Sequence, residues 1–271
     1  MESSQPLRNR TWASVLMILL AACGTAGLRT PPAAASASDS SPVETFALVE
    51  GGIAWGGYND VRIPPETGTE FSLTDDLTSD PASFIRLRLG VRLGDRHTLS
   101  LLAAPLRISS EGRFDQTVRY QGVDFPAGEE ISATYRFDSY RLTYRYSVYQ
   151  SDRLRADIGL TAKIRDAEIE LTTAELQASK TNVGFVPLIS FALCWQMADS
   201  WNLILDGDAL ASPGGQGRAE DVFVGMQRAL RQGLAIRAGY RILEGGADVD
   251  DVYNFALVHY ASVGFVFSVP R

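Results

Sequence analysis

Residues 139–149 read Ser-Tyr-Arg-Leu-Thr-Tyr-Arg-Tyr-Ser-Val-Tyr, and this stretch decides the fold. Successive side chains of a β-strand point to opposite faces, so Arg141, Thr143 and Arg145 share one face. The other face carries Leu142, Tyr144, Tyr146 and Val148. The stretch therefore predicts a strand with one cationic face and one apolar face.

Residues 82–94 repeat the pattern, with Arg86, Arg88 and Arg92 on one face. Ile85, Leu87, Leu89, Val91 and Leu93 lie on the other. A soluble β-sandwich shows the same alternation, so the pattern alone does not decide between a sandwich and a barrel. Its recurrence along most of the chain, behind an export signal, favours the wall of a membrane β-barrel.

The N-terminus has the layout of a secretory signal. Arg8 and Arg10 precede the apolar residues 15–20, and small residues follow. No other stretch approaches the roughly 20 apolar residues of a membrane-spanning helix. The net charge of −7 argues against a nucleic-acid partner, which needs a basic surface.

Leu20-Ala21-Ala22-Cys23-Gly24 resembles the lipobox of bacterial lipoproteins. The resemblance implies cleavage before Cys23 and attachment of lipid to its sulfur. In that family, Gly24 in place of an aspartate implies sorting onward to the outer membrane. The alternative is ordinary cleavage near Ala26.

Residues 24–43 are rich in Ala, Ser, Pro and Thr, a composition typical of a flexible tether. The predicted organisation is a signal peptide of lipoprotein type over 1–22, a tether over 23–43 and one barrel domain over 44–271.

Ten strands are expected, and the connections between them alternate between short turns and longer polar loops. This is the layout of outer-membrane barrels, which have an even number of strands. An eight-stranded barrel is the alternative, if 219–230 and 233–244 lie outside the wall. The expected strands are 44–60, 82–94, 97–118, 131–149, 153–171, 183–196, 200–211, 219–230, 233–244 and 252–267.

The cost of burying charge in lipid sets the direction of the arginines. An arginine on the lipid face near the bilayer centre costs about 2–4 kcal/mol, so several of them must point inward. The predicted interior charge network comprises Glu50, Arg86, Arg88, Arg92, Arg141, Arg145, Arg155, Asp157, Lys163, Arg165, Asp206, Asp208, Arg237 and Arg241.

Over residues 44–267 the chain resembles bacterial outer-membrane β-barrel proteins, most of all the small and poorly characterised ones. The resemblance implies location in the bacterial outer membrane, contact with lipid and lipopolysaccharide, and assembly by the barrel-assembly machinery. The stretches that carry it are Ser139–Tyr146, Gly159–Ile169, Leu205–Ala211 and Leu243–Tyr260. One departure is the C-terminus, because these proteins often end on an aromatic residue. Here Ser268-Val269-Pro270-Arg271 follows the aromatic Phe267.

Three functions are compatible with such a barrel. A structural or interaction role follows if ion pairs plug the interior, since barrels of about eight strands are filled by side chains. A narrow, anion-preferring pore for small solutes is the alternative, because inward cations outnumber carboxylates. A barrel-embedded hydrolase is the third, with His259, Asp206 and Asp208 as candidate catalytic residues.

The sequence carries no motif for a metal or a cofactor, and it does not identify a ligand. The outer loops hold clusters of carboxylates that are expected to form a solvated rim. Such clusters also suit divalent cations, which prefer oxygen ligands. These residues are Asp75, Asp76, Asp80, Glu129, Glu130, Asp248, Asp250 and Asp251.

Overall fold

A computed structural model describes residues 43–211 and 217–270. The signal peptide, Cys23 and nearly all of the tether lie outside the described residues. Within those residues, no helix has the length and hydrophobicity to cross a membrane.

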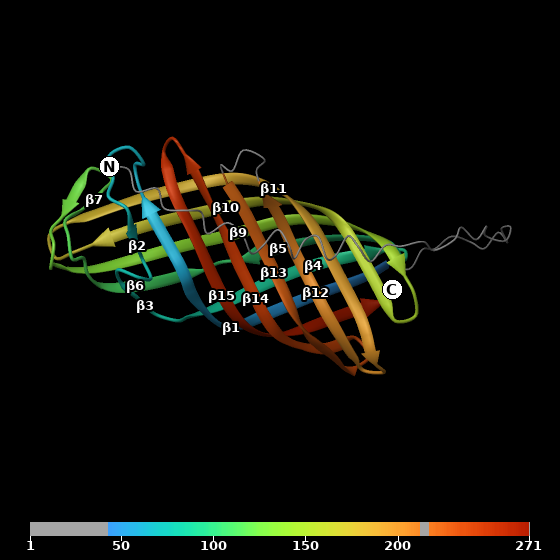
Figure 1. Cartoon of the computed structure of the whole chain (residues 1–271). Helices are drawn as coiled ribbons and strands as arrows, with labels where there is room; N and C mark the ends of the chain where they lie inside the picture. The colour runs from blue at the N-terminus through green and yellow to red at the C-terminus, as the bar shows by residue number, and fades with distance from the viewer. Residues whose placement is uncertain (1–42, 212–216, 271) are drawn as a thin grey trace, which may run out of the picture. The chain divides into compact units, whose positions relative to one another are not determined.

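The described chain forms a closed antiparallel barrel of ten wall segments (Figure 1). The last strand pairs with the first, and the β9–β10 pairing completes the circle. The prediction of a ten-stranded antiparallel barrel is confirmed. The segments are β1 (Val43–Arg62), β4 (Ala82–Leu93), β5 (His97–Ala104) with β6 (Arg107–Arg113), β9 (Glu130–Gln150), β10 (Leu154–Thr172), β11 (Gln177–Ala198), β12 (Trp201–Ala211), β13 (Gly217–Arg231), β14 (Leu234–Val249) and β15 (Val252–Pro270).

The third wall segment differs from the single strand predicted over 97–118. It consists of β5 and β6, which pair in turn with the same neighbour, β9. Pro105 lies at the break, where a residue without an N–H cannot donate to the sheet. The Phe137 N–H donates instead to the Leu106 carbonyl, at 2.9 Å, which keeps the wall continuous across the break.

Two of the expected long loops are mostly strand. Residues 173–176 alone connect β10 to β11, and residues 250–251 connect β14 to β15. A strand needs about 9–11 residues to cross a bilayer, whereas β9 has 21 residues and β11 has 22. The barrel wall therefore continues well beyond the hydrocarbon on the loop side. In Figure 1, β9 and β10 extend together toward the end where β7 lies.

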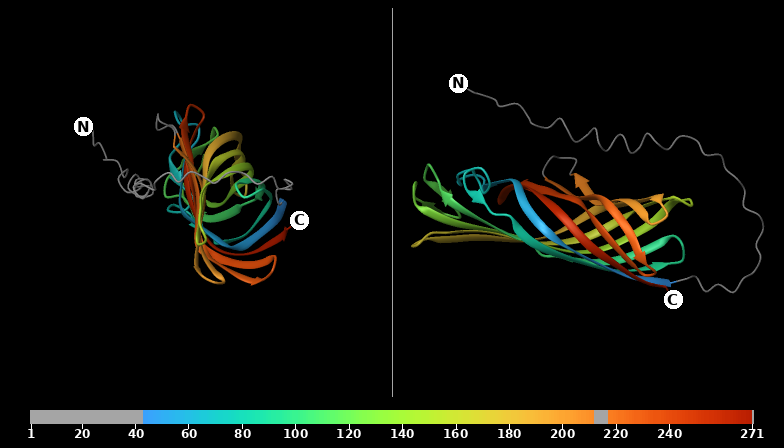
Figure 2. Two further views of the ribbon diagram at one scale, coloured as in Figure 1. Left: turned by 90° about the vertical axis from the view of Figure 1, so that its right-hand side faces the viewer. Right: turned by 90° about the horizontal axis from the view of Figure 1, so that it is seen from below.

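The two true long loops follow β1 and β6. Their acidic residues, such as Asp75, Asp76 and Glu130, are exposed as expected, and beneath them the loops contain an apolar core that was not expected. They include β2 (Phe71–Ser72), β3 (Thr78–Ser79), β7 (Val118–Tyr120) and β8 (Val123–Phe125), gathered at one end of the barrel (Figure 2). The buried loop core comprises Val61, Ile63, Phe71, Leu73, Leu77, Phe114, Val118, Tyr120, Phe125, Ile131, Ala133, Tyr135, Ile169, Leu171, Ala178 and Ala256. The sequence does not predict this core, because its apolar residues are isolated in sequence and meet only when both loops fold onto the strand ends.

The exterior carries an apolar belt on the short-turn half of the barrel. Leu160 on β10 and Phe185 on β11 are each 68% exposed. Exposed aromatic residues lie close to the short turns, as in the interfacial girdles of membrane barrels: these are Tyr144, Tyr146, Tyr149, Trp195 and Trp201. Toward the loop side the outward face becomes charged, beginning with Asp138 and Asp166, which are partners in the β9–β10 register.

Candidate functional site

The interior is organised around Asp221, a carboxylate with 2% exposure. It accepts hydrogen bonds from three guanidinium groups, at 3.0 Å from Arg86, 2.6 Å from Arg141 and 2.5 Å from Arg241. These donors come from β4, β9 and β14, and Asp221 comes from β13. The four strands are thus cross-linked through the middle of the barrel.

Glu50 on β1 is the second centre. Its carboxylate lies 3.3 Å from Arg237 and 3.3 Å from Arg241, and 3.9 Å from Arg86. Gly264 is its register partner on β15, and a Cβ there would lie 2.9 Å from the Glu50 Cγ. The missing side chain at Gly264 leaves the space that Glu50 occupies.

Asp206 and Asp208 on β12 are the remaining carboxylates of the interior. Asp208 lies 2.7 Å from Arg141 and accepts a hydrogen bond from Thr161 at 2.8 Å. Asp206 lies 3.0 Å from Arg145 and 3.4 Å from Arg88. Both carboxylates are therefore ion-pair partners of arginines.

These groups form one connected set, which we call the charge network. It consists of Arg86, Arg88, Arg141, Arg145, Arg237 and Arg241 with Glu50, Asp206, Asp208 and Asp221. Six cations face four carboxylates, so the network carries an excess of positive charge. Ion pairs buried in this way are strongly coupled, because removing one partner leaves an uncompensated charge.

The other charged residues expected in the interior lie outside this network. Arg92 pairs with Glu44 near the short-turn end. Arg155 and Asp157 pair with each other at 2.9 Å, and both are partly exposed. Arg165 hydrogen-bonds to Asn182 instead of a carboxylate. Lys163 lies with its ammonium 4.7 Å from the centre of the Phe137 ring.

Asp221, the centre of the network, was not identified from the sequence. The strand predicted over 219–230 does not alternate cleanly, so the pattern alone does not indicate which of its residues face inward. A signal was available in Asp221-Val222-Phe223-Val224, because Val222 and Val224 would suit lipid and leave Asp221 facing inward. The structure places Val224 at the surface with 46% exposure and buries Phe223 under Arg237.

The structure does not bring the three hydrolase candidates together. His259 points outward, between Trp55 and Tyr240, and its Nδ1 lies 2.5 Å from the Tyr240 hydroxyl. The side chains of Asp206 and Asp208 point into the barrel interior, toward arginines. His97, the only other histidine, is exposed and contacts Tyr144.

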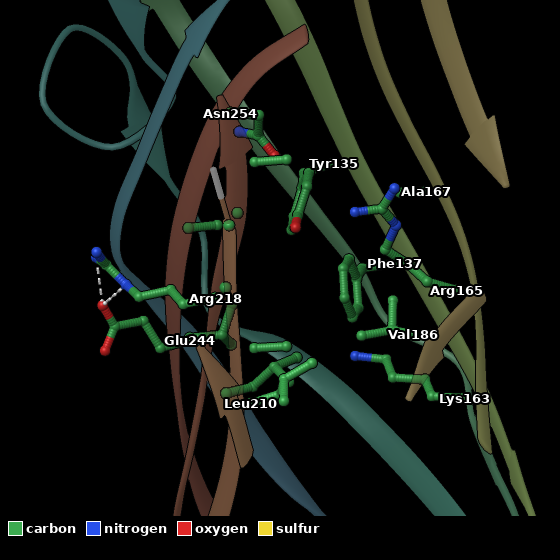
Figure 3. A pocket seen from close by; sticks show the side chains of 18 residues that line it. Tyr135, Phe137, Lys163, Arg165, Ala167, Val186, Leu210, Arg218, Glu244 and Asn254 are labelled. Atoms are coloured by element: carbon green, nitrogen blue, oxygen red, sulfur yellow. Dashed lines mark hydrogen bonds and ion pairs between the residues drawn. The ribbon is translucent and has the colours of Figure 1, made fainter. Parts of the chain in front are cut away.

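Two cavities lie on either side of the charge network. The cavity on the loop side has a volume of 270 Å³ and is lined by residues such as Tyr135, Lys163 and Leu243 (Figure 3). The cavity on the short-turn side has a volume of 390 Å³ and is lined by Arg88, Arg237 and other residues. The two cavities share no lining residue, and Asp221 and Arg141 lie between them. The charge network thus separates the interior into two compartments.

Charged groups also cluster on the outer face of the extended wall. Arg136 lies 3.0 Å from Asp166 and 3.1 Å from Glu168, and hydrogen bonding from Arg136 holds the pKa of Asp166 below its usual value. The Tyr58 hydroxyl donates to Glu244 at 2.6 Å. Burial, followed by this hydrogen bond, raises the pKa of Tyr58 to about 12.

The acidic loop residues do not converge on a cation site. Across residues 43–211 and 217–270, no three or more His, Cys, Asp or Glu side chains are grouped as metal ligands would be. Asp76 instead accepts a hydrogen bond from the Ser72 N–H at 2.7 Å, which fixes the turn of the first loop. The structure gives no support to the divalent-cation hypothesis for these loops.

No protein-family model matches the chain, and no curated protein matches it. Its structure is similar to that of the outer membrane protease OmpT from Escherichia coli, with a TM-score of 0.54 and 9% sequence identity, over 86% of this chain and 99% of that one. It also resembles the translocator domain of the autotransporter NalP from Neisseria meningitidis, with a TM-score of 0.41 and 16% identity, over 84% and 89% of the two chains. A third similar structure is Ail, the attachment invasion locus protein of Yersinia pestis, with a TM-score of 0.37 and 8% identity, over 83% and 99%. The likeness to OmpT establishes the fold, which is that of a bacterial outer-membrane β-barrel.

Proposed function

We propose that this protein is a plugged barrel of the bacterial outer membrane with a structural or interaction role in the cell envelope. The observation that carries the proposal is the charge network, whose buried ion pairs join strands from opposite sides of the barrel between the two cavities. Ions would have to break several buried ion pairs to pass, and each broken pair would leave a charge without compensation. The barrel then serves to hold the extended wall and the loop core above the membrane.

A narrow anion-preferring pore is the second candidate, because cations exceed carboxylates in the interior. Planar-bilayer recording separates the two. We expect no steady conductance from the natural protein. We expect conductance from an Arg141→Ala/Asp221→Ala double variant, which removes one cation and one carboxylate from the network together.

The matched control is the Arg155→Ala/Asp157→Ala double variant, which removes an ion pair at the partly exposed edge of the interior. It is expected to stay closed. Discrete anion-selective conductance of the natural protein would favour the pore and reject the plug.

The hydrolase is not proposed. OmpT is a protease by its description, and the likeness to it concerns the fold alone. Hydrolysis would need acid–base groups at one place, and His259 faces away from both candidate aspartates.

Anchoring of the chain through a lipid on Cys23 is part of the proposal and is supported by the lipobox-like residues 20–24. Labelling with a fatty-acid analogue should mark the natural protein and fail to mark Cys23→Ala. An unlabelled natural protein would instead indicate ordinary cleavage of the signal peptide.

The proposed partners are outer-membrane lipid, lipopolysaccharide and the barrel-assembly machinery. The outer face around Arg136 lies just beyond the apolar belt, where headgroups lie, and there Arg136 offsets the charge of Asp138, Asp166 and Glu168, which would otherwise repel anionic lipopolysaccharide. The Arg136→Ala variant should fold more slowly than the natural protein into vesicles that contain lipopolysaccharide. Its folding rate into vesicles without lipopolysaccharide should be unchanged. Phe265 and Phe267, near the end of β15, support assembly by the barrel-assembly machinery. Depletion of that machinery should leave the chain unfolded in the periplasm.

A further inference from the structure

The loop-side cavity has the size of a ligand site. It lies between the charge network and the loop core, and Tyr135 and Ala256 belong to both the loop core and the cavity lining. Its volume of 270 Å³ exceeds the roughly 150 Å³ of a buried apolar cavity that admits benzene. A ligand larger than a single aromatic ring can therefore be accommodated.

Lys163 is a buried cation that points into this cavity. The residue is 3% exposed, and its ammonium group contacts the Phe137 ring. Among the residues that the structure describes, no carboxylate lies within 4.0 Å of its ammonium group. Figure 3 shows the ammonium beside Phe137, directed toward the middle of the cavity. A buried charge without a partner is costly, so an anion at this position would be stabilising.

Arg165 lies two residues further along β10, on the same face of the strand, and also lines the cavity. Its Nη2 donates to Asn182, whereas its Nε has no hydrogen-bond partner among the described residues. Arg165 thus adds a second cation to the lining, although Figure 3 shows its guanidinium group and the Lys163 ammonium apart, with the Phe137 ring between them.

The only carboxylate in the cavity lining is directed elsewhere. Glu244 is the register partner of Glu220, next to the inward-facing Asp221, so its side chain lies on the outer face of the wall. There it is held by Tyr58 and by Arg218, whose Nη2 lies 2.6 Å from the carboxylate. The positive charge of the cavity is therefore not neutralised by Glu244.

Apart from Tyr135, Arg218 and Asn254, the rest of the lining is apolar. It includes Phe137, Val186, Leu210, Ala219, Leu243 and Val258. Binding pockets for small molecules are mostly apolar with a few polar groups that fix orientation. This combination suits a ligand with one anionic end and an apolar body.

We propose that the loop-side cavity binds a small monocarboxylate with an apolar body, whose carboxylate pairs with Lys163. Binding at this site is independent of the plug, which lies below the cavity. It adds a ligand-binding activity to the structural role proposed above.

Calorimetric titration of the full-length protein in non-ionic detergent micelles tests the proposal. The probe is 4-phenylbutyrate, and the neutral comparison is 4-phenylbutanamide, which has the same body without the charge. Titration into empty micelles corrects for partition into detergent. We expect saturable 1:1 binding of the acid and at least about 10-fold weaker binding of the amide, as loss of a charge-assisted hydrogen bond implies.

The chain contains only two lysines, which provides a matched pair of variants. Lys163→Met should weaken binding of the acid about 10-fold or more, and Lys163→Arg should restore most of it. Lys180→Met, outside the cavity lining, should leave binding unchanged. Ala219→Leu should abolish binding by filling the apolar part of the cavity. A heat-modifiable band on a gel confirms that each variant is folded.

Four results would overturn the proposal. Equal affinity for the acid and the amide would show an apolar cavity without anion recognition. Equal affinity of inorganic phosphate and 4-phenylbutyrate would show an anion site that ignores the apolar body. Unchanged binding in folded Lys163→Met, or no saturable binding to the natural protein, would reject the site itself.

Discussion

A buried carboxylate that accepts hydrogen bonds from three guanidinium groups cannot be replaced by a neutral side chain without leaving buried positive charge uncompensated. Asp221 is in this position, with Arg86, Arg141 and Arg241 all within 3.0 Å. The alternation of residues 139–149 and 82–94 indicates which arginines point inward, but not which carboxylate each one meets. At the residue scale, the energy of the interior depends on partners that are far apart in sequence.

Replacement of Asp221 by Asn should therefore destabilise the barrel strongly. We expect a loss of about 3–5 kcal/mol, because the arginines stay buried while their shared counter-charge is removed. The urea midpoint in detergent micelles measures this loss. Asp199→Asn, in an exposed turn, should change stability by less than about 0.5 kcal/mol. Similar midpoints for the two variants would show that the network contributes little.

Tyr58 makes stability depend on alkaline pH. Its pKa is raised to about 12 in the folded protein by burial and by the hydrogen bond to Glu244, against about 10 in an unfolded chain. The neutral phenol is thus favoured by folding. Its contribution is complete below pH 10 and is lost as the pH rises toward 12. Tyr58→Phe should show a shallower decline of the unfolding midpoint over this range, and parallel declines would contradict the assignment.

At the scale of the element, each long strand serves two environments. β10 presents Ile158, Leu160 and Ile164 to the apolar belt, and beyond them Asp166 and Glu168 to Arg136. The outward face thus changes from apolar to charged within one strand. This change marks the edge of the hydrocarbon and explains why a strand of 19 residues is longer than a bilayer requires.

An arginine placed in the belt should be costly, and one placed beyond it should not. Leu160→Arg is expected to reduce the free energy of folding into vesicles by about 2–4 kcal/mol. Val249→Arg, at the far end of β14, should cost no more than about 1 kcal/mol, as near the membrane interface. Denaturant titration in vesicles compares the two. Equal costs would mean that the belt is not in contact with lipid.

Closure of the barrel depends on the pairing of β1 with β15, the first and last strands of the wall, which we call the seam. Gly52 in this seam has a φ of +149°, and a Cβ there would lie 2.0 Å from the Ala261 carbonyl oxygen. The close approach of the two strands therefore requires glycine at this position.

Gly52→Ala should impair closure of the barrel. We expect loss or weakening of the fast-migrating band of unboiled samples, because backbone atoms cannot give way as a side chain can. Gly122→Ala is the control, since Gly122 also has a positive φ but has no atom within 4 Å of the position of a Cβ. If both variants kept the fast band equally, the seam would tolerate a side chain.

The sequence by itself determined the ten strands, the inward direction of the arginines and the apolar belt. These features follow from a period of two along each strand and from the cost of charge in lipid, both of which are local. Only the tertiary structure decided the role of Asp221, the loop core, the length of the wall beyond the membrane and the cavity at Lys163. Each of these depends on which strands and loops meet across the barrel. The ion pair between Asp221 and Arg86, for example, joins residues 135 positions apart in the sequence.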